Sequence, residues 1–164
     1  MTITAGPITV GDTIPDTDLR VMTADGPTTV RSSEILGKGK VVLFAVPGAF
    51  TPGCSNVHLP GFVEGGDELR AKGVDTIACV AVNDPFVMDA WGKAHGVGDG
   101  ILMLADGNAE FTTAMGLLLD GSGFGLGQRS KRYAAVLQDG VVTSIDVDET
   151  GIDLSTCSNL LLKV

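Results

Sequence analysis

The fold is decided by residues 41–54, which read VVLFAVPGAFTPGC. The first six of these residues are apolar and end at a proline, which is typical of a short strand buried on both faces. Residues 55–72 follow with a helical period, and the apolar side chains that suit one face are Val57, Leu59, Phe62, Val63 and Leu69. The sequence therefore predicts a strand, a restricted loop and a helix, with the thiol of Cys54 at the start of the helix.

The rest of the chain repeats this alternation of strand and helix. Apolar runs predict further strands at residues 76–82, 101–104, 133–138 and 141–147, and helical patterns predict helices at residues 85–95 and 108–118 and after Ser155. Asp139-Gly140 separates the last two strands and is the signal of a tight hairpin, so these strands are expected to be antiparallel neighbours. We expect one α/β domain over residues 1–164, with a central mixed sheet flanked by helices.

The bulk composition limits the classes of function. Of the 164 residues, 44% are hydrophobic and 19% are charged, which is ordinary for a folded domain. With 20 Asp plus Glu against 11 Lys plus Arg, the net charge of -9 offers phosphate backbones and anionic lipids no broad positive surface. The longest apolar runs are far shorter than the roughly 20 residues of a membrane span. We therefore expect neither nucleic acid nor a membrane as a partner.

The first residues and the cysteines bear on location. Residues 1–6, MTITAG, contain neither a basic region with an apolar core nor an Arg-rich amphipathic stretch. The three cysteines, Cys54, Cys79 and Cys157, are too few and too scattered for a disulfide framework. These features predict a cytoplasmic protein, and an organelle stays open for a chain whose transit peptide has been removed.

Cys54 is the first candidate for chemistry. Unpaired backbone N–H groups and the positive end of the helix dipole favour the thiolate at a helix N-terminus. Thr51 can bring its hydroxyl beside the sulfur, while Pro47 and Pro52 restrict the loop. From the residues alone two interpretations remain, a reactive nucleophile or a small residue packed near the start of a helix.

Four motifs carry a resemblance to a known family: PGAFTPGC at residues 47–54, HLPGF at 58–62, VNDPFV at 82–87 and RSKRY at 129–133. They resemble the type II, peroxiredoxin-five-like branch of the peroxiredoxins, in the thioredoxin-fold superfamily. The order and spacing are similar from VGDTIP at residues 10–15 to the C-terminus, so the match covers nearly the whole chain. The resemblance implies a thioredoxin-like fold and a thiol-dependent peroxidase that needs no metal or organic cofactor.

The resemblance also implies an active site. Cys54 would be the peroxidatic cysteine, and Thr51 would hydrogen-bond its thiolate and the bound peroxide. Pro47 would shield the sulfur from water, and Arg132 would hold the thiolate and the peroxide oxygens. Arg129 would either pair with an acidic residue or help to orient the site. The implied substrates are hydrogen peroxide and alkyl hydroperoxides, with peroxynitrite as a third.

Turnover requires a second thiol to condense with the sulfenic acid that peroxide leaves on Cys54. Cys157 is the candidate, because LSTCS at residues 154–158 resembles the resolving segment of the atypical two-cysteine members. A disulfide requires Cα atoms within about 7 Å, so we expect local unfolding before the two cysteines meet. Thioredoxin or glutaredoxin is the implied reductant. Cys79 lies in a central apolar strand and is expected to be inert.

His58 and three apolar residues carry further expectations. Cys54 and His58 are four residues apart, as two metal ligands on one helix face can be, but no second pair of ligands accompanies them. His58 is therefore expected to orient the loop by hydrogen bonding.

Phe50, Phe124 and Leu126 are expected in the walls of the entrance to the active site. Surfaces near this entrance form the dimer contact in related proteins, so a homodimer is expected.

Two other functions stay open from the sequence. A disulfide reductase or isomerase of thioredoxin fold would share the helix-terminal cysteine, but residues 54–57, CSNV, lack the second cysteine of a Cys-X-X-Cys motif. A redox sensor or disulfide-exchange protein that passes oxidation to a partner would keep Cys54 without rapid turnover. Catalytic peroxide consumption distinguishes a peroxidase from both.

Overall fold

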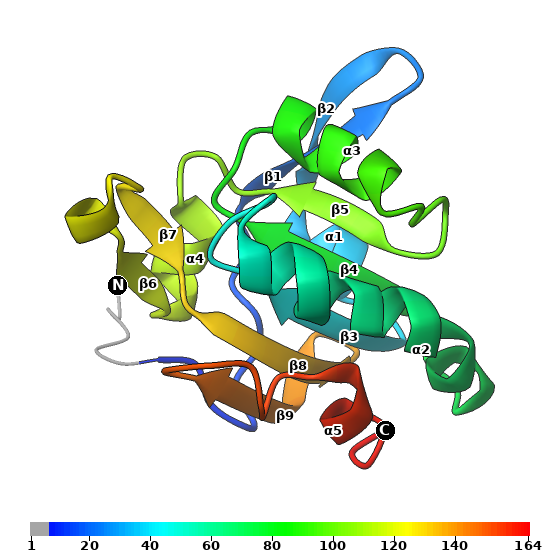
Figure 1. The fold of residues 1–164 in the computed structure, drawn as a ribbon. Coiled ribbons are helices and arrows are strands. Elements are labelled where there is room, and N and C mark those ends of the chain that lie inside the picture. The colour runs from blue at the N-terminus through cyan, green and yellow to red at the C-terminus, as the bar shows by residue number, and fades with distance from the viewer. Residues whose placement is uncertain (1–6) are drawn as a thin grey trace.

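The computed structural model describes residues 7–164 and is built around a seven-stranded sheet (Figure 1). In their spatial order the strands are β2 (Gly26–Arg31), β1 (Asp18–Thr23), β5 (Leu102–Ala105), β4 (Thr76–Ala81), β3 (Lys40–Ala45), β8 (Arg132–Gln138) and β9 (Val141–Asp148). The central strands β5, β4 and β3 are parallel, and the strands on either side are antiparallel to their neighbours. The sheet is therefore mixed, as predicted.

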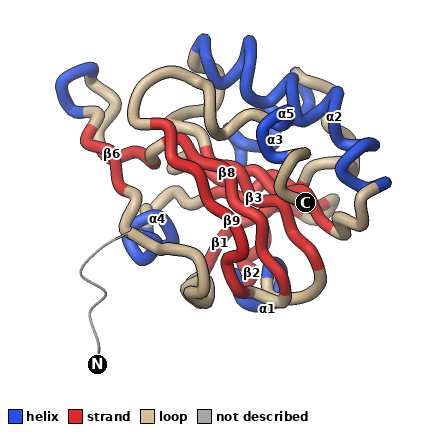
Figure 2. Tube along the Cα trace, turned by 90° about the horizontal axis from the view of Figure 1, so that it is seen from below, coloured by secondary structure: helices blue, strands red, loops and turns tan. Residues whose placement is uncertain are grey.

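Helices cover both faces of the sheet, which gives three layers (Figure 2). One face carries α2 (Leu59–Ala71), α3 (Pro85–Ala94) and α5 (Cys157–Leu160), and the other carries α1 (Ser32–Leu36) and α4 (Glu110–Met115). A π-helical turn, η1 (Cys54–His58), leads into α2. A hairpin of β6 (Leu118–Asp120) and β7 (Gln128–Ser130), with the 3₁₀ turn η2 (Ser122–Phe124) between them, lies beside the sheet.

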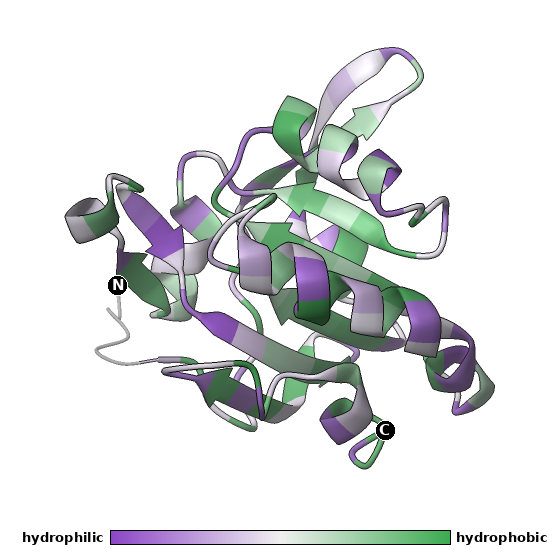
Figure 3. Ribbon diagram, in the orientation of Figure 1, coloured by the Kyte–Doolittle hydropathy of each residue, from purple (hydrophilic) through white to green (hydrophobic). Residues whose placement is uncertain are grey.

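The alternation of side chains along β3 produces a core on each face. Val42 and Phe44 contribute to the core under α2 and α3, whereas Val41 and Leu43 contribute to the core under α1 and α4. All four side chains are fully buried. Figure 3 shows the same distribution, with hydrophobic central strands and hydrophilic residues along the outer side of α2. This confirms the prediction that residues 41–46 form a strand covered on both faces.

Three segments that are distant in the sequence meet at one edge of the sheet. Because β3 and β4 are parallel, the loop at residues 47–53 and Asn83 leave their strands at the same edge. β8 is antiparallel to β3, with Tyr133 opposite Ala45, so it begins with Arg132 close to where β3 ends. The strand register thus brings Arg132 to the loop that precedes Cys54.

Most of the predicted elements are confirmed within one or two residues. The helix expected at residues 108–118 is shorter, because Gly116, with φ of 72°, takes the left-handed conformation that ends α4, and Leu118 already belongs to β6. The hairpin at Asp139-Gly140 is confirmed, since both residues have positive φ, of 50° and 81°, as a type I′ turn requires.

Several short elements have no clear signal in the sequence. The β1–β2 hairpin and the β6–β7 hairpin are partly exposed and lack long apolar runs, so their pattern is weak. Residues 1–6, on which the expectation about targeting signals rests, lie outside the described residues. Within residues 7–164, no helix has the length and hydrophobicity to cross a membrane.

Candidate active site

Cys54 lies in the first turn of a helical stretch that begins at Pro52, and its side chain is fully buried. It also begins the π-helical turn η1, a rare geometry that often marks functional sites. In the preceding loop Phe50 has φ of 65°, which is uncommon for a residue other than glycine. The candidate nucleophile therefore follows a constrained loop and opens an unusual helical turn.

Arg132 reaches the sulfur from the start of β8. Its Nη2 donates to Cys54 Sγ over 3.2 Å, and its Nη1 donates to His58 Nδ1 over 2.8 Å. A guanidinium keeps its charge and presents several N–H donors in one plane, so a single side chain can serve both groups. Arg132 thus places a cationic N–H donor at the sulfur of the candidate nucleophile. The fold thus joins two predicted site residues that are 78 positions apart.

His58 closes the π-helical turn and is buried, with 1% of its surface exposed. Its ring packs against Phe44 and Phe62, with centroids 5.2 and 5.6 Å away. Burial lowers the pKa of His58 from 6.5 to about 4, and the charge of Arg132 acts in the same direction. The neutral ring accepts from Arg132 at Nδ1, which leaves Nε2–H to donate to the Ser155 carbonyl over 2.8 Å. His58 is hydrogen-bonded as expected, but its partners are Arg132 and Ser155 rather than the loop at residues 47–53.

Thr51 and Pro47 are the other two predicted site residues. The Thr51 hydroxyl donates to the Gly48 carbonyl over 2.7 Å, so its proton is not directed at Cys54, as the resemblance implied, and its oxygen remains an acceptor. Pro47 lines a hollow together with Gly53 and Arg132. Both residues therefore lie in the loop that leads to the sulfur.

Asn83 and Arg129 anchor the backbone of that loop. The Ala49 N–H donates to Asn83 Oδ1 over 3.0 Å. Arg129 Nη1 donates to the Pro47 carbonyl over 3.5 Å, and its Nε donates to the Leu126 carbonyl over 2.9 Å. Of the two roles open to Arg129, these contacts favour orientation of the loop over pairing with an acidic residue.

The other two cysteines are buried and carry free thiols. Cys79 is fully buried in β4, and burial raises its pKa well above the usual value, which agrees with the expectation that it is inert. Cys157 begins α5 and is 5% exposed, and burial raises its pKa to about 11.

The sulfur of Cys157 is seated against α2 at a glycine. A Cβ added to Gly65 would lie only 2.5 Å from Cys157 Sγ, so the missing side chain provides the space for the sulfur. Gly65 follows Cys54 by eleven residues of helical backbone, which corresponds to about 16 Å. The two sulfurs are therefore much farther apart than the geometry of a disulfide allows.

A hollow of about 370 Å³ opens beside the π-helical turn. Its lining residues are Pro47, Gly53, Leu119, Lys131, Arg132 and residues 148–152. Phe50, Phe124 and Leu126, which are expected in the walls of the entrance, are not among the described residues that line this hollow. They project outward with 54%, 87% and 37% of their surface exposed. The apolar wall comes from Leu119 and Ile152 instead, because β6 and the segment after β9 fold over this edge.

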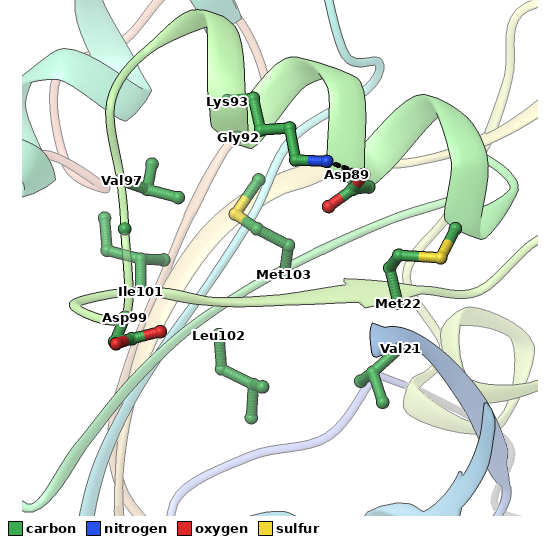
Figure 4. A pocket seen from close by; sticks show the side chains of 11 residues that line it. Val21, Met22, Asp89, Gly92, Lys93, Val97, Asp99, Ile101, Leu102 and Met103 are labelled. Atoms are coloured by element: carbon green, nitrogen blue, oxygen red, sulfur yellow. Dashed lines mark ion pairs between the residues drawn. The ribbon is translucent and has the colours of Figure 1, made fainter. Parts of the chain in front are cut away.

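A second hollow, of about 400 Å³, lies between α3, β5 and β1 (Figure 4). Met22, Met103 and Val97 point into it, and Lys93 pairs with Asp89 over 2.9 Å at its border. No cysteine or histidine is among the described residues that line this second hollow. The turn at Cys54 therefore remains the candidate active site.

Three residues around the site were not predicted from the sequence: Asn83, Ser155, and Asp148, whose carboxylate accepts from the Ser155 N–H over 2.8 Å. Asn83 lies inside the VNDPFV motif, but its contact to the loop depends on the parallel pairing of β3 and β4. Ser155 acts through its backbone carbonyl, which every residue possesses, so no residue pattern could single it out.

Comparison with known proteins identifies the family of the chain. The family model described as Redoxin matches residues 9–161. The chain is 48% identical over 161 residues to Peroxiredoxin-2E, chloroplastic, of Arabidopsis thaliana, covering 95% of this chain and 68% of that protein. It is 47% identical over 158 residues to Peroxiredoxin-2B of the same plant, covering 96% and 98%.

Solved structures extend the comparison to three dimensions. Reduced Prx3 from Vibrio vulnificus, in complex with hydrogen peroxide, is 48% identical with a TM-score of 0.91, covering 95% of this chain and 98% of that one. Peroxiredoxin 5 from Alvinella pompejana is 39% identical with a TM-score of 0.85, covering 95% and 97%. Family, sequence and structure agree with the resemblance carried by the motifs, and the chain belongs to the Redoxin family as a type II peroxiredoxin of thioredoxin-like fold, a thiol-dependent peroxidase.

Proposed function

We propose that Cys54 is the nucleophile of this peroxidase and that it reduces hydrogen peroxide and alkyl hydroperoxides. The observation that carries the proposal is the 3.2 Å contact from Arg132 Nη2 to Cys54 Sγ in the first turn of a helix. Hydrogen peroxide is the ligand of the Vibrio vulnificus relative, which supports it as a substrate here.

The proposed chemistry is a displacement at the O–O bond. The thiolate sulfur forms a bond to one peroxide oxygen, the O–O bond breaks, and the second oxygen leaves with the electron pair and takes up a proton. Cys54 becomes a sulfenic acid, and the product is water or an alcohol. Negative charge moves from sulfur to the leaving oxygen, so a fixed cationic donor beside both atoms stabilises the transition state more than the ground state. Arg132 supplies this donor.

Thr51 and Pro47 complete the proposed site. The Thr51 oxygen, oriented by its bond to the Gly48 carbonyl, is an acceptor for the O–H of the incoming peroxide. Pro47 contributes no N–H and limits access of water to the sulfur. The peroxide would enter from the hollow that Pro47, Gly53 and Arg132 line.

The test is peroxide consumption with an added dithiol and thioredoxin or glutaredoxin. Wild-type protein is expected to turn over many times, Cys54→Ser to lose turnover, and Cys79→Ser, the matched control, to keep it. Retained turnover in Cys54→Ser would overturn the assignment of the nucleophile. Rapid stoichiometric oxidation of wild type without turnover would favour a redox sensor instead.

Cys157 is proposed as the resolving thiol, followed by reduction by thioredoxin or glutaredoxin. Because about 16 Å of helix separates Cys54 from Gly65, against which Cys157 packs, both segments must detach before they can join. Peptide mapping after one equivalent of hydrogen peroxide is expected to give a Cys54–Cys157 linkage within one chain. The absence of this linkage would contradict the resolving role.

The assembly and the setting complete the proposal. Phe50 and Phe124 expose large apolar surfaces, which supports a homodimer of single-domain chains covering residues 1–164. Light scattering of the reduced protein is expected to give twice the mass of one chain. The Phe124→Glu variant is expected to give a lower mass.

Free thiols require a compartment that keeps them reduced. We propose the cytoplasm, or else an organelle, since two relatives are named as chloroplastic.

A further inference from the structure

A continuous chain of hydrogen bonds joins the two proposed reaction partners. It starts at Cys54 Sγ, which accepts from Arg132, and continues through Arg132 to His58 Nδ1. His58 Nε2–H then donates to the Ser155 carbonyl over 2.8 Å. Ser155 lies only two residues before Cys157, so this series of hydrogen bonds ends on the backbone segment that carries the second thiol.

The other side of Ser155 is held by Asp148 at the end of β9. Asp148 Oδ2 accepts from the Ser155 N–H over 2.8 Å and from its hydroxyl over 2.6 Å, and the carboxylate also accepts from the N–H groups of Asp153 and Leu154. Ser155 is fully buried and Asp148 is 7% exposed. Although burial raises it, these hydrogen bonds keep the pKa of Asp148 below its usual value, so the carboxylate stays charged near neutral pH.

The same segment touches the peroxidatic helix at two further points. A Cβ on Gly53 would meet Ile152 Cδ1 at 3.0 Å, so the Ile152 side chain covers the backbone next to Cys54. At the other end Cys157 Sγ occupies the space left by Gly65. Residues 152–157 therefore lie along η1 and α2, and the bond from His58 to Ser155 is the polar contact between these two ends.

We infer that His58 is a positioning residue for both cysteines: it orients Arg132 at Cys54 and, through the Ser155 carbonyl, holds the Cys157 segment closed. Oxidation of Cys54 removes the thiolate charge that attracts Arg132, which weakens the first link. Unwinding of the π-helical turn then withdraws His58 from Ser155. One local event thereby frees both cysteine segments, which in the proposed function must move before they react.

Release also activates Cys157 chemically. In its closed position burial raises the pKa of this thiol to about 11, so almost none of it is ionised near neutral pH. Once exposed to solvent, more thiolate is available to attack the sulfenic sulfur of Cys54. The S–S bond forms, the S–O bond breaks, and the hydroxyl leaves with a proton as water, so the step needs no further oxidant.

The experiment measures the accessibility of Cys157 without any peroxide. In a Cys54→Ser, Cys79→Ser background Cys157 is the remaining thiol, and its alkylation by iodoacetamide is followed by mass spectrometry. We expect His58→Leu to accelerate alkylation about tenfold, because a lost buried hydrogen bond of about 1.4 kcal/mol changes an opening equilibrium by that factor. His58→Gln, whose amide nitrogen can still donate to Ser155, is expected to restore slow alkylation.

Two serine variants test the same closed segment without changing His58, in case the histidine variants fold poorly. Ser155→Ala removes the hydroxyl bond to Asp148 and is expected to accelerate alkylation, whereas Ser158→Ala, at an exposed neighbour on α5, is expected to match the background protein. The inference would be overturned if His58→Leu were alkylated at the rate of the background protein, or if Ser158→Ala accelerated alkylation as much as Ser155→Ala. Faster alkylation in His58→Gln than in His58→Leu would overturn it as well.

A second measurement separates this inference from the proposed resolving role. In the protein with its native cysteines, the Cys54–Cys157 linkage is trapped at short times after one equivalent of hydrogen peroxide. Ser155→Ala is expected to form the linkage faster by the factor found for alkylation. Ser155→Ala could form the linkage at the wild-type rate although its alkylation is faster. In that case Cys157 resolves, but release of its segment does not control the reaction, and the inference is wrong. If wild type forms none, the resolving role fails, and with it the claim that release serves the reaction.

Discussion

At the scale of single residues, the site depends on how Arg132 divides its donors. One nitrogen holds the sulfur of Cys54 and the other holds His58, while a buried neutral imidazole leaves Nδ1 free to accept. A lysine carries the same charge but presents it as a point on a flexible stem, so it cannot hold two acceptors in a fixed plane. Charge and geometry therefore both matter at this position.

Arg132→Met is expected to lower kcat/KM for hydrogen peroxide by about 10²–10³-fold, the usual effect of removing a donor that stabilises transition-state charge. Arg132→Lys keeps the charge but lacks the planar set of N–H donors, so its kcat/KM is expected to lie between those of Arg132→Met and wild type. The measurement is stopped-flow oxidation over a series of peroxide concentrations. Arg70→Met, at an exposed arginine of α2, serves as the matched control and is expected to keep the wild-type rate. Equal rates for Arg132→Met and Arg70→Met would contradict the role of Arg132.

His58 is expected to make stability depend on pH between about 6.5 and 4. The unfolded imidazole takes a proton near pH 6.5 and the folded one near pH 4, so the unfolded state binds more protons in this window. The free energy of unfolding should therefore fall as the pH drops, by about 3 kcal/mol when the window has been crossed. Urea unfolding at pH 7 and pH 4 measures the loss.

His58→Gln does not titrate and is expected to lose less stability than wild type over the same range. The charged groups that act on His58 are Arg132 and Asp148, and both remain in the variant. Asp106, whose pKa burial raises, shifts stability in the opposite direction but does so in both proteins, so the difference between them isolates His58. An identical pH dependence would contradict the assignment.

At the scale of elements, two of the three glycines of α2 have contrasting surroundings. Gly61 has no heavy atom within 4 Å of the position that a Cβ would occupy, whereas Gly65 has Cys157 Sγ at 2.5 Å. Glycine inside a helix is unfavourable relative to alanine because it loses more conformational freedom on folding. Of these two, Gly65 has a packing reason to be glycine, namely the space that it leaves for the Cys157 sulfur of α5.

Gly61→Ala is accordingly expected to stabilise the reduced protein by about 0.5–1 kcal/mol. Gly65→Ala is expected to destabilise it by about 1–3 kcal/mol, the usual cost of overpacking, because the sulfur or α5 must shift. Urea unfolding of both variants checks the opposite signs. In a Cys157→Ala background the nearest remaining atom at Gly65 is a Cβ at 3.6 Å, so Gly65→Ala should cost much less there. If Gly65→Ala destabilised the Cys157→Ala protein as much as it destabilises wild type, the claim that Gly65 makes room for the Cys157 sulfur would be wrong.

At the scale of the whole molecule, the site is assembled where the ends of β3, β4 and β8 meet, with the segment after β9 folded over it. The α3 helix is connected to the same place, because Trp91 Nε1 donates to Ser55 Oγ over 2.9 Å beside Cys54. Trp91 is fully buried and is the sole tryptophan of the chain. Its fluorescence should therefore report unwinding of the π-helical turn.

Hydrogen peroxide is expected to change the Trp91 fluorescence in two phases. The first should accelerate with peroxide concentration, as oxidation of Cys54 does, and the second should not, because it follows local unfolding and formation of the disulfide. Stopped-flow fluorescence of wild type and Cys157→Ser measures both. A second phase that persists unchanged in Cys157→Ser would contradict the link between the turn and Cys157.

Local features of the chain are well predicted by its sequence. Residues 41–46 read as a buried strand because an apolar run has few other uses in a folded domain, and Asp139-Gly140 reads as a hairpin because few dipeptides tolerate two positive φ angles. Cys54 stands out for the same kind of reason, since a strand, a proline-containing loop and a helix start are all properties of neighbouring residues. The length of α4 is mispredicted, because Gly116 ends the helix before its apolar pattern does.

The sequence by itself therefore determined the α/β class, the family motifs and the thiol at the helix start. The tertiary structure decided which groups surround that thiol. Arg132 reaches it through the antiparallel register of β8 on β3, and Ser155 reaches His58 through the fold of the segment after β9. The physical reason is range: backbone preferences and hydrophobic periodicity act over a few residues, whereas hydrogen bonds between distant residues depend on strand register and helix packing, which exist only in the folded chain.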